Sequence, residues 1–165
     1  MEKIIKEKCF SLDKLKEDYE ELKNKYALPE FSELNRLFDI EDVEIETDFL
    51  LRKIRRIISE RMAAYSRFIE IILNPSNAPM FFFKLIKKLD SKDKEVLAWL
   101  YEELGSIEVD TISLDLDYSE KNEADFIIRM YKVFNENIRI KFLEIVDKLS
   151  NGNDNNKKYN GSYFG

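Results

Sequence analysis

The residues with the clearest capacity for chemistry are a group of basic side chains between positions 52 and 67. They are Arg52, Lys53, Arg55, Arg56 and Arg67. At about 100° per residue of a helix, we place them opposite an arc of apolar residues in the same segment. Guanidinium groups bind phosphates and carboxylates through paired hydrogen bonds. The spacing therefore predicts a helix with an arginine face, which suits a nucleic acid or an acidic protein surface.

The distribution of charge along the chain leaves two interpretations of this arginine face. Residues 49–92 carry 10 basic and 3 acidic groups, whereas residues 1–48 carry 8 and 15, and residues 93–149 carry 7 and 14. In the first interpretation, the acidic segments pack beside the basic segment and neutralise it. In the second, the basic residues stay open for a ligand. The net charge of −6 weighs against nucleic acid as that ligand.

Side chains suited to catalysis are scarce in this sequence. The chain has no histidine and a single cysteine, Cys9. This composition excludes histidine-based catalytic triads, histidine zinc sites and an internal disulfide. Six carboxylates gather in residues 39–48, but their spacing lacks the glycine and the final glutamate of a calcium-binding EF-hand loop. We expect a protein that is not an enzyme, with no catalytic residues, no cofactor and no metal.

Two polar residues interrupt the predicted apolar faces. Arg61 projects into the apolar arc of its helix, and Asn135 lies on the inward arc of the last helix. A buried guanidinium needs a carboxylate or carbonyl partner, and a buried amide needs a polar partner. For Arg61 we weigh three roles, which are a structural ion pair, a side chain that reaches water at the bundle edge, and a ligand contact. Whether Arg61 and Asn135 lie together is left open.

Three consecutive phenylalanines, Phe81, Phe82 and Phe83, follow a break at "NPSNAP" (residues 74–79). Consecutive residues of a helix point about 100° apart, so these three rings cannot all face one core. Phe82 shares a helix face with Leu85, Ile86 and Leu89, and we expect it to be buried. Phe81 or Phe83 is then the residue expected to contact a partner.

The apolar periodicity predicts an all-α fold, a single-domain bundle of about five to six helices. The expected helices span residues 11–26, 31–38, 48–74, 78–89, 92–104 and 119–149. We expect Ser11 and Ser119 to cap helix N-termini, Asp90 or Ser91 to cap the helix over residues 92–104, and Gly105 to end it. In the first helix, apolar residues at alternating spacings of three and four form a seam. This seam predicts either packing within the bundle or an N-terminal coiled-coil-like hairpin that self-associates.

The last segments of the chain are harder to assign. Residues 106–118 alternate as a strand does, but they also fit a helix that continues past Gly105. Because a lone strand leaves its backbone groups unpaired, we prefer the helix. Residues 150–165 are polar and contain three of the four glycines, so we expect a disordered tail after a helical domain over residues 1–149. No apolar run approaches about 18 residues, so no membrane span is expected.

The stretch "DFLLRKIRRIISERMAAYSRFIEIIL", the loop after it and then "LDSKDKEVLAWLYEEL" resemble small all-helical archaeal proteins of unassigned function. The same arrangement is similar to the helical part of GINS replication-scaffold subunits. This resemblance implies a non-catalytic scaffold. Together with the seam of the first helix, the aromatic content of 13% and the lack of catalytic residues, it leads us to expect a cytoplasmic interaction module that binds a protein partner or itself. The alternative is nucleic-acid binding through the arginine face.

Overall fold

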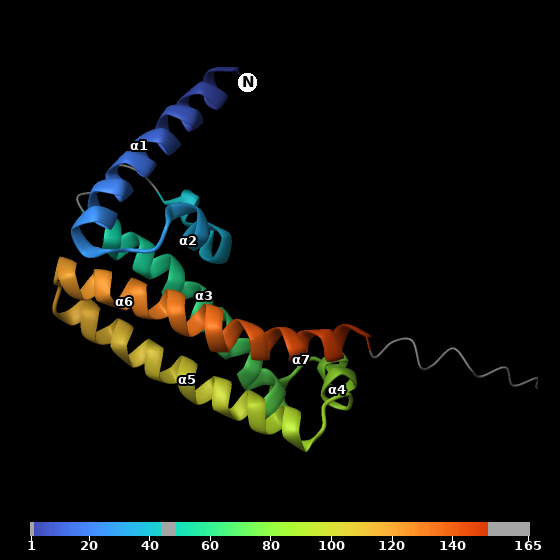
Figure 1. Ribbon diagram of the computed structural model, residues 1–165. Coiled ribbons are helices and arrows are strands. Elements are labelled where there is room, and N and C mark those ends of the chain that lie inside the picture. Colours follow the sequence, from blue (N-terminus) through green and yellow to red (C-terminus); the bar gives the residue numbers. More distant parts are fainter. Residues whose placement is uncertain (1, 44–48, 152–165) are drawn as a thin grey trace, which may run out of the picture.

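The computed structural model describes residues 2–43 and 49–151, which form an all-α bundle with no strand within these ranges (Figure 1). The fold class predicted from the sequence is therefore confirmed. The α-helices are α1 (Glu2–Tyr26), α2 (Phe31–Phe38), α3 (Leu50–Leu73), α4 (Met80–Ile86), α5 (Ser91–Leu116), α6 (Glu120–Val133) and α7 (Arg139–Asn151). Two short 3-10 helices, η1 (Ile40–Asp42) and η2 (Pro75–Asn77), and a π-helical segment, η3 (Phe134–Ile138), complete the described elements.

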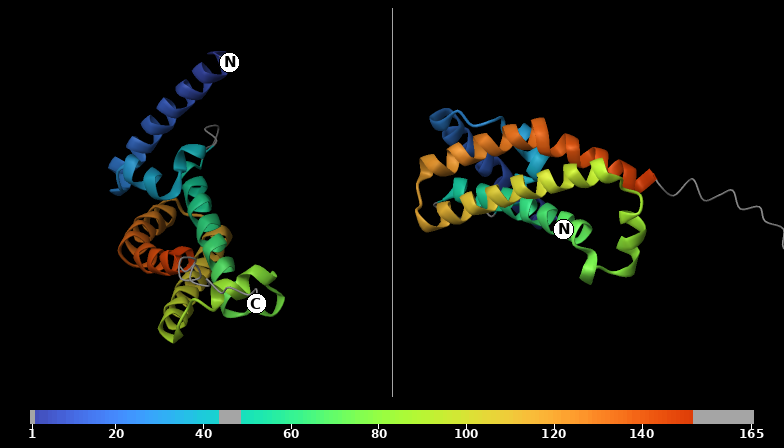
Figure 2. Two further views of the ribbon diagram at one scale, coloured as in Figure 1. Left: turned by 90° about the vertical axis from the view of Figure 1, so that its right-hand side faces the viewer. Right: turned by 90° about the horizontal axis from the view of Figure 1, so that it is seen from below.

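The core lies where α3 packs against α5 and α6. Helices α6 and α7, joined through η3, run back along α5 as a long helical hairpin, and α3 crosses behind this hairpin (Figures 1 and 2). Ile54 and Ile58 of α3, Leu97 and Leu100 of α5 and Ile127 of α6 are fully buried. Removing this apolar surface from water is the main force that holds the helices together.

Local signals in the sequence set several helix ends. The Asp90 side chain accepts a hydrogen bond from the Asp93 backbone N–H at 2.9 Å, and the Asp93 side chain accepts one from the Asp90 backbone N–H at 3.0 Å. This capping box satisfies two donors at the start of α5. Ser119 accepts from the Asn122 N–H at the start of α6, as predicted. At the end of α1, Ala27 takes a left-handed conformation with φ of 55°, which closes the helix before Pro29.

The structure corrects several predicted helix boundaries, that of α4 among them, since it spans Met80–Ile86 and not residues 78–89. Helix α1 begins at Glu2, so Ser11 lies inside it and is not its cap. Helix α5 continues through Gly105 to Leu116, because Leu104 and Ile107 are buried on the same face and packing outweighs the low helix propensity of glycine. The preference for helix over residues 106–118 is thus confirmed as far as Leu116. The last predicted helix is divided by η3, where one turn widens.

Two predictions extend beyond the residues that the structure describes. The predicted start of the third helix at residue 48 lies outside them, and α3 is described from Leu50. Residues 150 and 151 belong to α7, so the expected tail does not begin at 150, and residues 152–165 lie outside the described part. Within the described ranges, no helix has the length and apolar character needed to cross a membrane.

Candidate functional site

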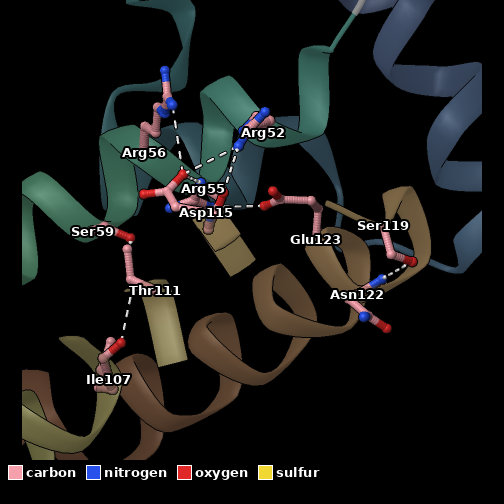
Figure 3. A network of polar contacts seen from close by, with 10 residues as sticks. All are labelled: Arg52, Arg55, Arg56, Ser59, Ile107, Thr111, Asp115, Ser119, Asn122 and Glu123. Atoms are coloured by element: carbon pink, nitrogen blue, oxygen red, sulfur yellow. Dashed lines mark hydrogen bonds and ion pairs between the residues drawn. The ribbon is translucent and has the colours of Figure 1, made fainter. Parts of the chain in front are cut away.

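A buried ion pair joins the arginine face of α3 to the hairpin of α5 and α6 (Figure 3). The Arg55 Nε donates to Glu123 Oε2 at 2.7 Å, and both side chains are completely shielded from solvent. The Arg55 Nη2 donates to Asp115 Oδ1 at 2.6 Å. One guanidinium therefore holds a carboxylate from each helix of the hairpin, and this geometry ties three helices at one point.

Asp115 also faces the two neighbouring arginines of α3. Arg52 Nη2 and Arg56 Nη2 each lie 3.5 Å from Asp115 Oδ1. Arg52 further donates to the Asp115 backbone carbonyl at 3.3 Å, at the last turn of α5. Positive charge at a helix C-terminus complements the carbonyl groups that the helix leaves unpaired. The arginines thus neutralise both the carboxylate and the end of the helix.

The pKa values of the two carboxylates around Arg55 are shifted in opposite directions. The hydrogen bond from Arg55 lowers the pKa of Asp115 below its ordinary value. Burial raises the pKa of Glu123, and this effect exceeds the stabilisation of its charged form by Arg55. Glu123 Oε1 and Arg55 Nη1 are also buried without a hydrogen-bond partner among the described residues. Desolvation of the pair is therefore only partly offset by its own contacts.

The predicted arginine face is not a continuous exposed surface. Arg55, which we placed on the exposed arc, is completely buried, because it follows the buried Leu51 by one helical turn. Arg52 and Lys53 are half-buried, whereas Arg56 and Arg67 are exposed. With Arg52, Arg55 and Arg56 all directed to Asp115, most of this face serves contacts within the bundle.

Arg61 has the kind of partners that a guanidinium within an apolar arc requires. It donates to the Leu37 carbonyl at 3.1 Å and to Asp39 Oδ2 at 2.6 Å, at the C-terminal end of α2. Its side chain is 32% exposed, so Arg61 lies at the edge of the core and not within it. Asn135 is half-buried in η3. The hydrogen bonds of Arg61 thus go to α2 and its C-cap.

The most exposed apolar group on the short helix α4 consists of Met80, Phe81 and Phe83, which we call the aromatic surface. Their exposed fractions are 84%, 58% and 44%, and no residue of α4 is buried. Phe82 is half-buried, so our expectation of a core residue at this position was too strong. Exposed large apolar side chains that are grouped on one element are candidates for an interaction site.

A chain of aromatic contacts connects this surface to the core. Phe81 contacts Phe82 with ring centroids 4.3 Å apart, and Phe82 contacts Phe68 of α3 at 6.2 Å. Phe68 in turn contacts Phe142 of α7 at 6.0 Å, and Phe142 contacts Tyr65 of α3 at 5.0 Å. Phe82 therefore anchors α4 on the bundle, which leaves the rings on either side of it in the sequence to face outward.

Basic residues border the aromatic surface. Lys84 of α4 and Lys87, the C-cap residue of this helix, are exposed. Lys88 is partly buried and donates to the Leu149 carbonyl of α7, which fixes the end of α4 against the last helix. An apolar centre with a charged rim is the usual anatomy of a protein–protein interface. The positive rim favours a partner with acidic residues around its own apolar centre.

Comparison with known proteins gives no family for this chain, since no family model, no curated protein and no solved structure matches it. Across residues 2–43 and 49–151, no three histidine, cysteine, aspartate or glutamate side chains gather where they would hold a metal ion. The geometry of the arginine contacts around Asp115 and of the aromatic surface is therefore the basis on which a function is proposed.

Proposed function

We propose that this protein is a non-catalytic helical interaction module that binds a protein partner or itself, and that it acts in the cytoplasm. The observation that carries the proposal is the aromatic surface of α4. Its three side chains are held outward on a helix that Phe82 anchors to the core. Aromatic and methionine side chains are enriched at the centres of protein interfaces, where they contribute most of the binding energy.

The orientation of the arginine side chains of α3 favours a protein partner over a nucleic acid. Arg52, Arg55 and Arg56 face Asp115, and Arg55 is buried. Phosphate binding needs arginines that are open to the ligand. The alternative function predicted from the arginine face thus has less support than an interface on α4.

The test is affinity purification of the full chain and its variants from a native lysate. A variant with Phe81→Asp and Phe83→Asp places two carboxylates on the aromatic surface and leaves Phe82 in place. We expect the proteins that co-purify with the original chain to be lost with this variant. The matched control is Leu143→Asp, because Leu143 of α7 is 52% exposed and lies on another helix.

The proposal requires the control to recover the same proteins as the original chain. It also requires the Phe81→Asp, Phe83→Asp variant to keep its helical circular dichroism and its thermal transition, so that a loss of binding is not a loss of fold. If that folded variant recovers the same proteins as the original chain, the aromatic surface is not the interface.

A further inference from the structure

A cavity of about 180 Å³ lies between α3 and α5, and no residue of the aromatic surface lines it. Its floor is apolar, because Met62, Leu104 and Ile107 are buried core residues. The small side chain of Ala63 also lines it and leaves space between the two helices. Cavities that enclose a complete small-molecule ligand measure about 300–1,000 Å³. This cavity is smaller, and its size suits a single side chain.

The hydroxyl groups that line the cavity have already used their protons. The Thr111 hydroxyl donates to the Ile107 carbonyl at 3.0 Å. The Thr111 and Ser59 hydroxyl oxygens lie 3.0 Å apart (Figure 3). Because a hydroxyl has one proton and that of Thr111 is used, Ser59 donates to Thr111. The Ser59 oxygen then keeps only acceptor capacity, so a polar group that enters the cavity must bring its own donors.

Two carboxylates, those of Glu60 on α3 and Glu108 on α5, also line the cavity and are exposed to solvent. Within the described part of the chain, neither has an ion pair or a side-chain hydrogen bond. Arg56, one helical turn before Glu60, is directed to Asp115 instead. A cleft with apolar walls concentrates the field of such charges and attracts cations. The cavity therefore combines an apolar floor, unpaired negative charge and acceptors without donors.

This combination matches the side chain of an arginine or a lysine. The methylene stem of either residue is apolar, and the charged head carries donors and no acceptor. The stem fits the apolar floor, and the head can reach the carboxylates of Glu60 and Glu108. A phosphate or a carboxylate group would bring more acceptors and more negative charge, and both carboxylates would repel it.

The surface beside the cavity favours a protein as the source of this side chain. Val109 and Ile112 of α5 directly follow the lining residues Glu108 and Thr111, and they are 65% and 55% exposed. Covering these apolar side chains lowers the free energy of the complex, since it removes their surface from water. A protein that places a basic side chain in the cavity can also cover them, whereas a free small cation cannot.

We infer that the cavity between α3 and α5 binds a basic side chain, an arginine or a lysine, of a protein partner. The charged head contacts Glu60 and Glu108, and the stem packs on the apolar floor. The inference rests on the proposed role as an interaction module and adds a second contact site to it. Charge recognition at this site is opposite in sign to that at the basic rim of the aromatic surface.

The test uses n-butylguanidinium, which has the stem and the head of an arginine side chain. It is titrated into the isotope-labelled full chain and followed by two-dimensional NMR. We expect shifts of the backbone amide signals of residues 59–63 and 104–111, with a dissociation constant of about 1–10 mM. n-Butylurea has nearly the same shape without the charge and should bind at least about threefold more weakly. Equal binding of the two probes, shifts spread over the whole surface, or no shift up to about 50 mM overturns the inference.

Two variants test the two halves of the cavity. Glu60→Gln with Glu108→Gln removes both charges and should raise the dissociation constant of n-butylguanidinium at least about threefold. Its matched control is Glu95→Gln with Glu102→Gln, which changes the net charge by the same amount at exposed positions of α5 outside the cavity. Ala63→Leu fills the cavity and should prevent binding while both carboxylates remain. A folded Glu60, Glu108 variant that binds the probe as tightly as its control overturns the inference.

Recovery of proteins from a native lysate tests the source of the side chain. The Glu60→Gln, Glu108→Gln variant should lose proteins that the Glu95→Gln, Glu102→Gln control recovers. If it loses the probe but recovers the same proteins, the cavity binds a free small cation and the assignment to a protein partner is wrong. The variant with Phe81→Asp and Phe83→Asp should bind the probe as the original chain does. Failure of the aromatic surface as an interface and failure of the cavity as a site for a basic side chain are therefore observed separately.

Discussion

At the residue scale, Arg55 shows how a single charge organises this bundle. It lies between Leu51 and Ile58 on the inward side of α3 and contacts carboxylates on both helices of the hairpin. Burying an arginine and a glutamate together gives little net stability, because the loss of hydration offsets their attraction. Removing only one of them leaves an uncompensated buried charge. The pair therefore specifies which helices meet more than it adds to the free energy of unfolding.

This view predicts the effect of Arg55→Met. The variant leaves Glu123 buried without its cation, and we expect it to lower the free energy of unfolding by about 3 kcal/mol at pH 7. The pKa of Glu123 is already raised by burial, and loss of Arg55 raises it further. A group whose pKa is higher in the folded state favours folding at low pH and loses this contribution as the pH rises. The deficit should therefore be smaller at pH 5 than at pH 7, as measured by urea unfolding.

The double variant with Arg55→Met and Glu123→Leu is the control for that prediction. It removes both charges and fills their space with apolar groups, so it should recover most of the stability lost in the single variant. Its unfolding free energy should also vary less with pH than that of Arg55→Met. Equal losses in the single and double variants would mean that packing of the arginine chain, and not its charge, stabilises this position.

Both members of this pair stand at positions that the sequence could have identified. Arg55 follows Leu51 by four residues and precedes Ile58 by three, so it belongs to the apolar arc of α3. Glu123 likewise precedes Ile127 by four residues in the inward stripe of α6. Two opposite charges within two inward stripes predict a buried pair. Arg61, which we placed inside the arc, instead lies at its edge, and its Asp39 partner comes from the turn after α2.

At the element scale, the sequence predicted α2 to the residue and the fold class, but it did not predict the extent of α5. Gly105 is a common helix terminator, yet Leu104 and Ile107 on either side of it are buried in one face. Packing of that face decides the local structure. The apolar pattern of α5 was hard to interpret because two opposite faces are apolar, which weakens the contrast that identifies a helix. The π-helical turn of η3 has no recognisable signal in the sequence.

The capping box at the start of α5 gives a prediction at this scale. Asp90→Ala removes the side-chain acceptor for the Asp93 N–H and should lower the free energy of unfolding by about 1 kcal/mol. Glu95→Ala, at an exposed position one turn into the same helix, is the control and should change it by less than about 0.5 kcal/mol. Thermal and urea unfolding measure both variants. Equal effects would show that the box does not contribute to the stability of α5.

At the scale of the whole molecule, the three charge blocks of the sequence neutralise one another through specific contacts. In the basic segment, Arg52, Arg55 and Arg56 form ion pairs with Asp115 of the second acidic block. Arg61 of the same segment forms an ion pair with Asp39 of the first acidic block. The geometry thus supports the first of the two interpretations of the charge pattern. The sequence alone could not separate them, because block charges do not say which residues face each other.

Internal neutralisation predicts how the chain behaves toward polyanions. We expect the original protein to bind heparin and duplex DNA weakly at about 0.1 M salt, because the arginines that would bind phosphates are already paired with Asp115. Asp115→Asn removes the charge of that carboxylate, so that the charges of Arg52 and Arg56 become available to a polyanion outside the bundle. Heparin affinity should rise, and the rise should diminish steeply as salt is added.

The matched control for this prediction is Asp117→Asn, which changes the net charge by the same amount at an exposed position two residues along the chain. If affinity depended on net charge alone, both variants would bind heparin equally well. A specific release of Arg52 and Arg56 requires Asp115→Asn to bind more tightly than Asp117→Asn at every salt concentration. Strong, salt-sensitive binding by the original chain would instead mean that its exposed cations form a polyanion site and would restore nucleic acid as the favoured ligand.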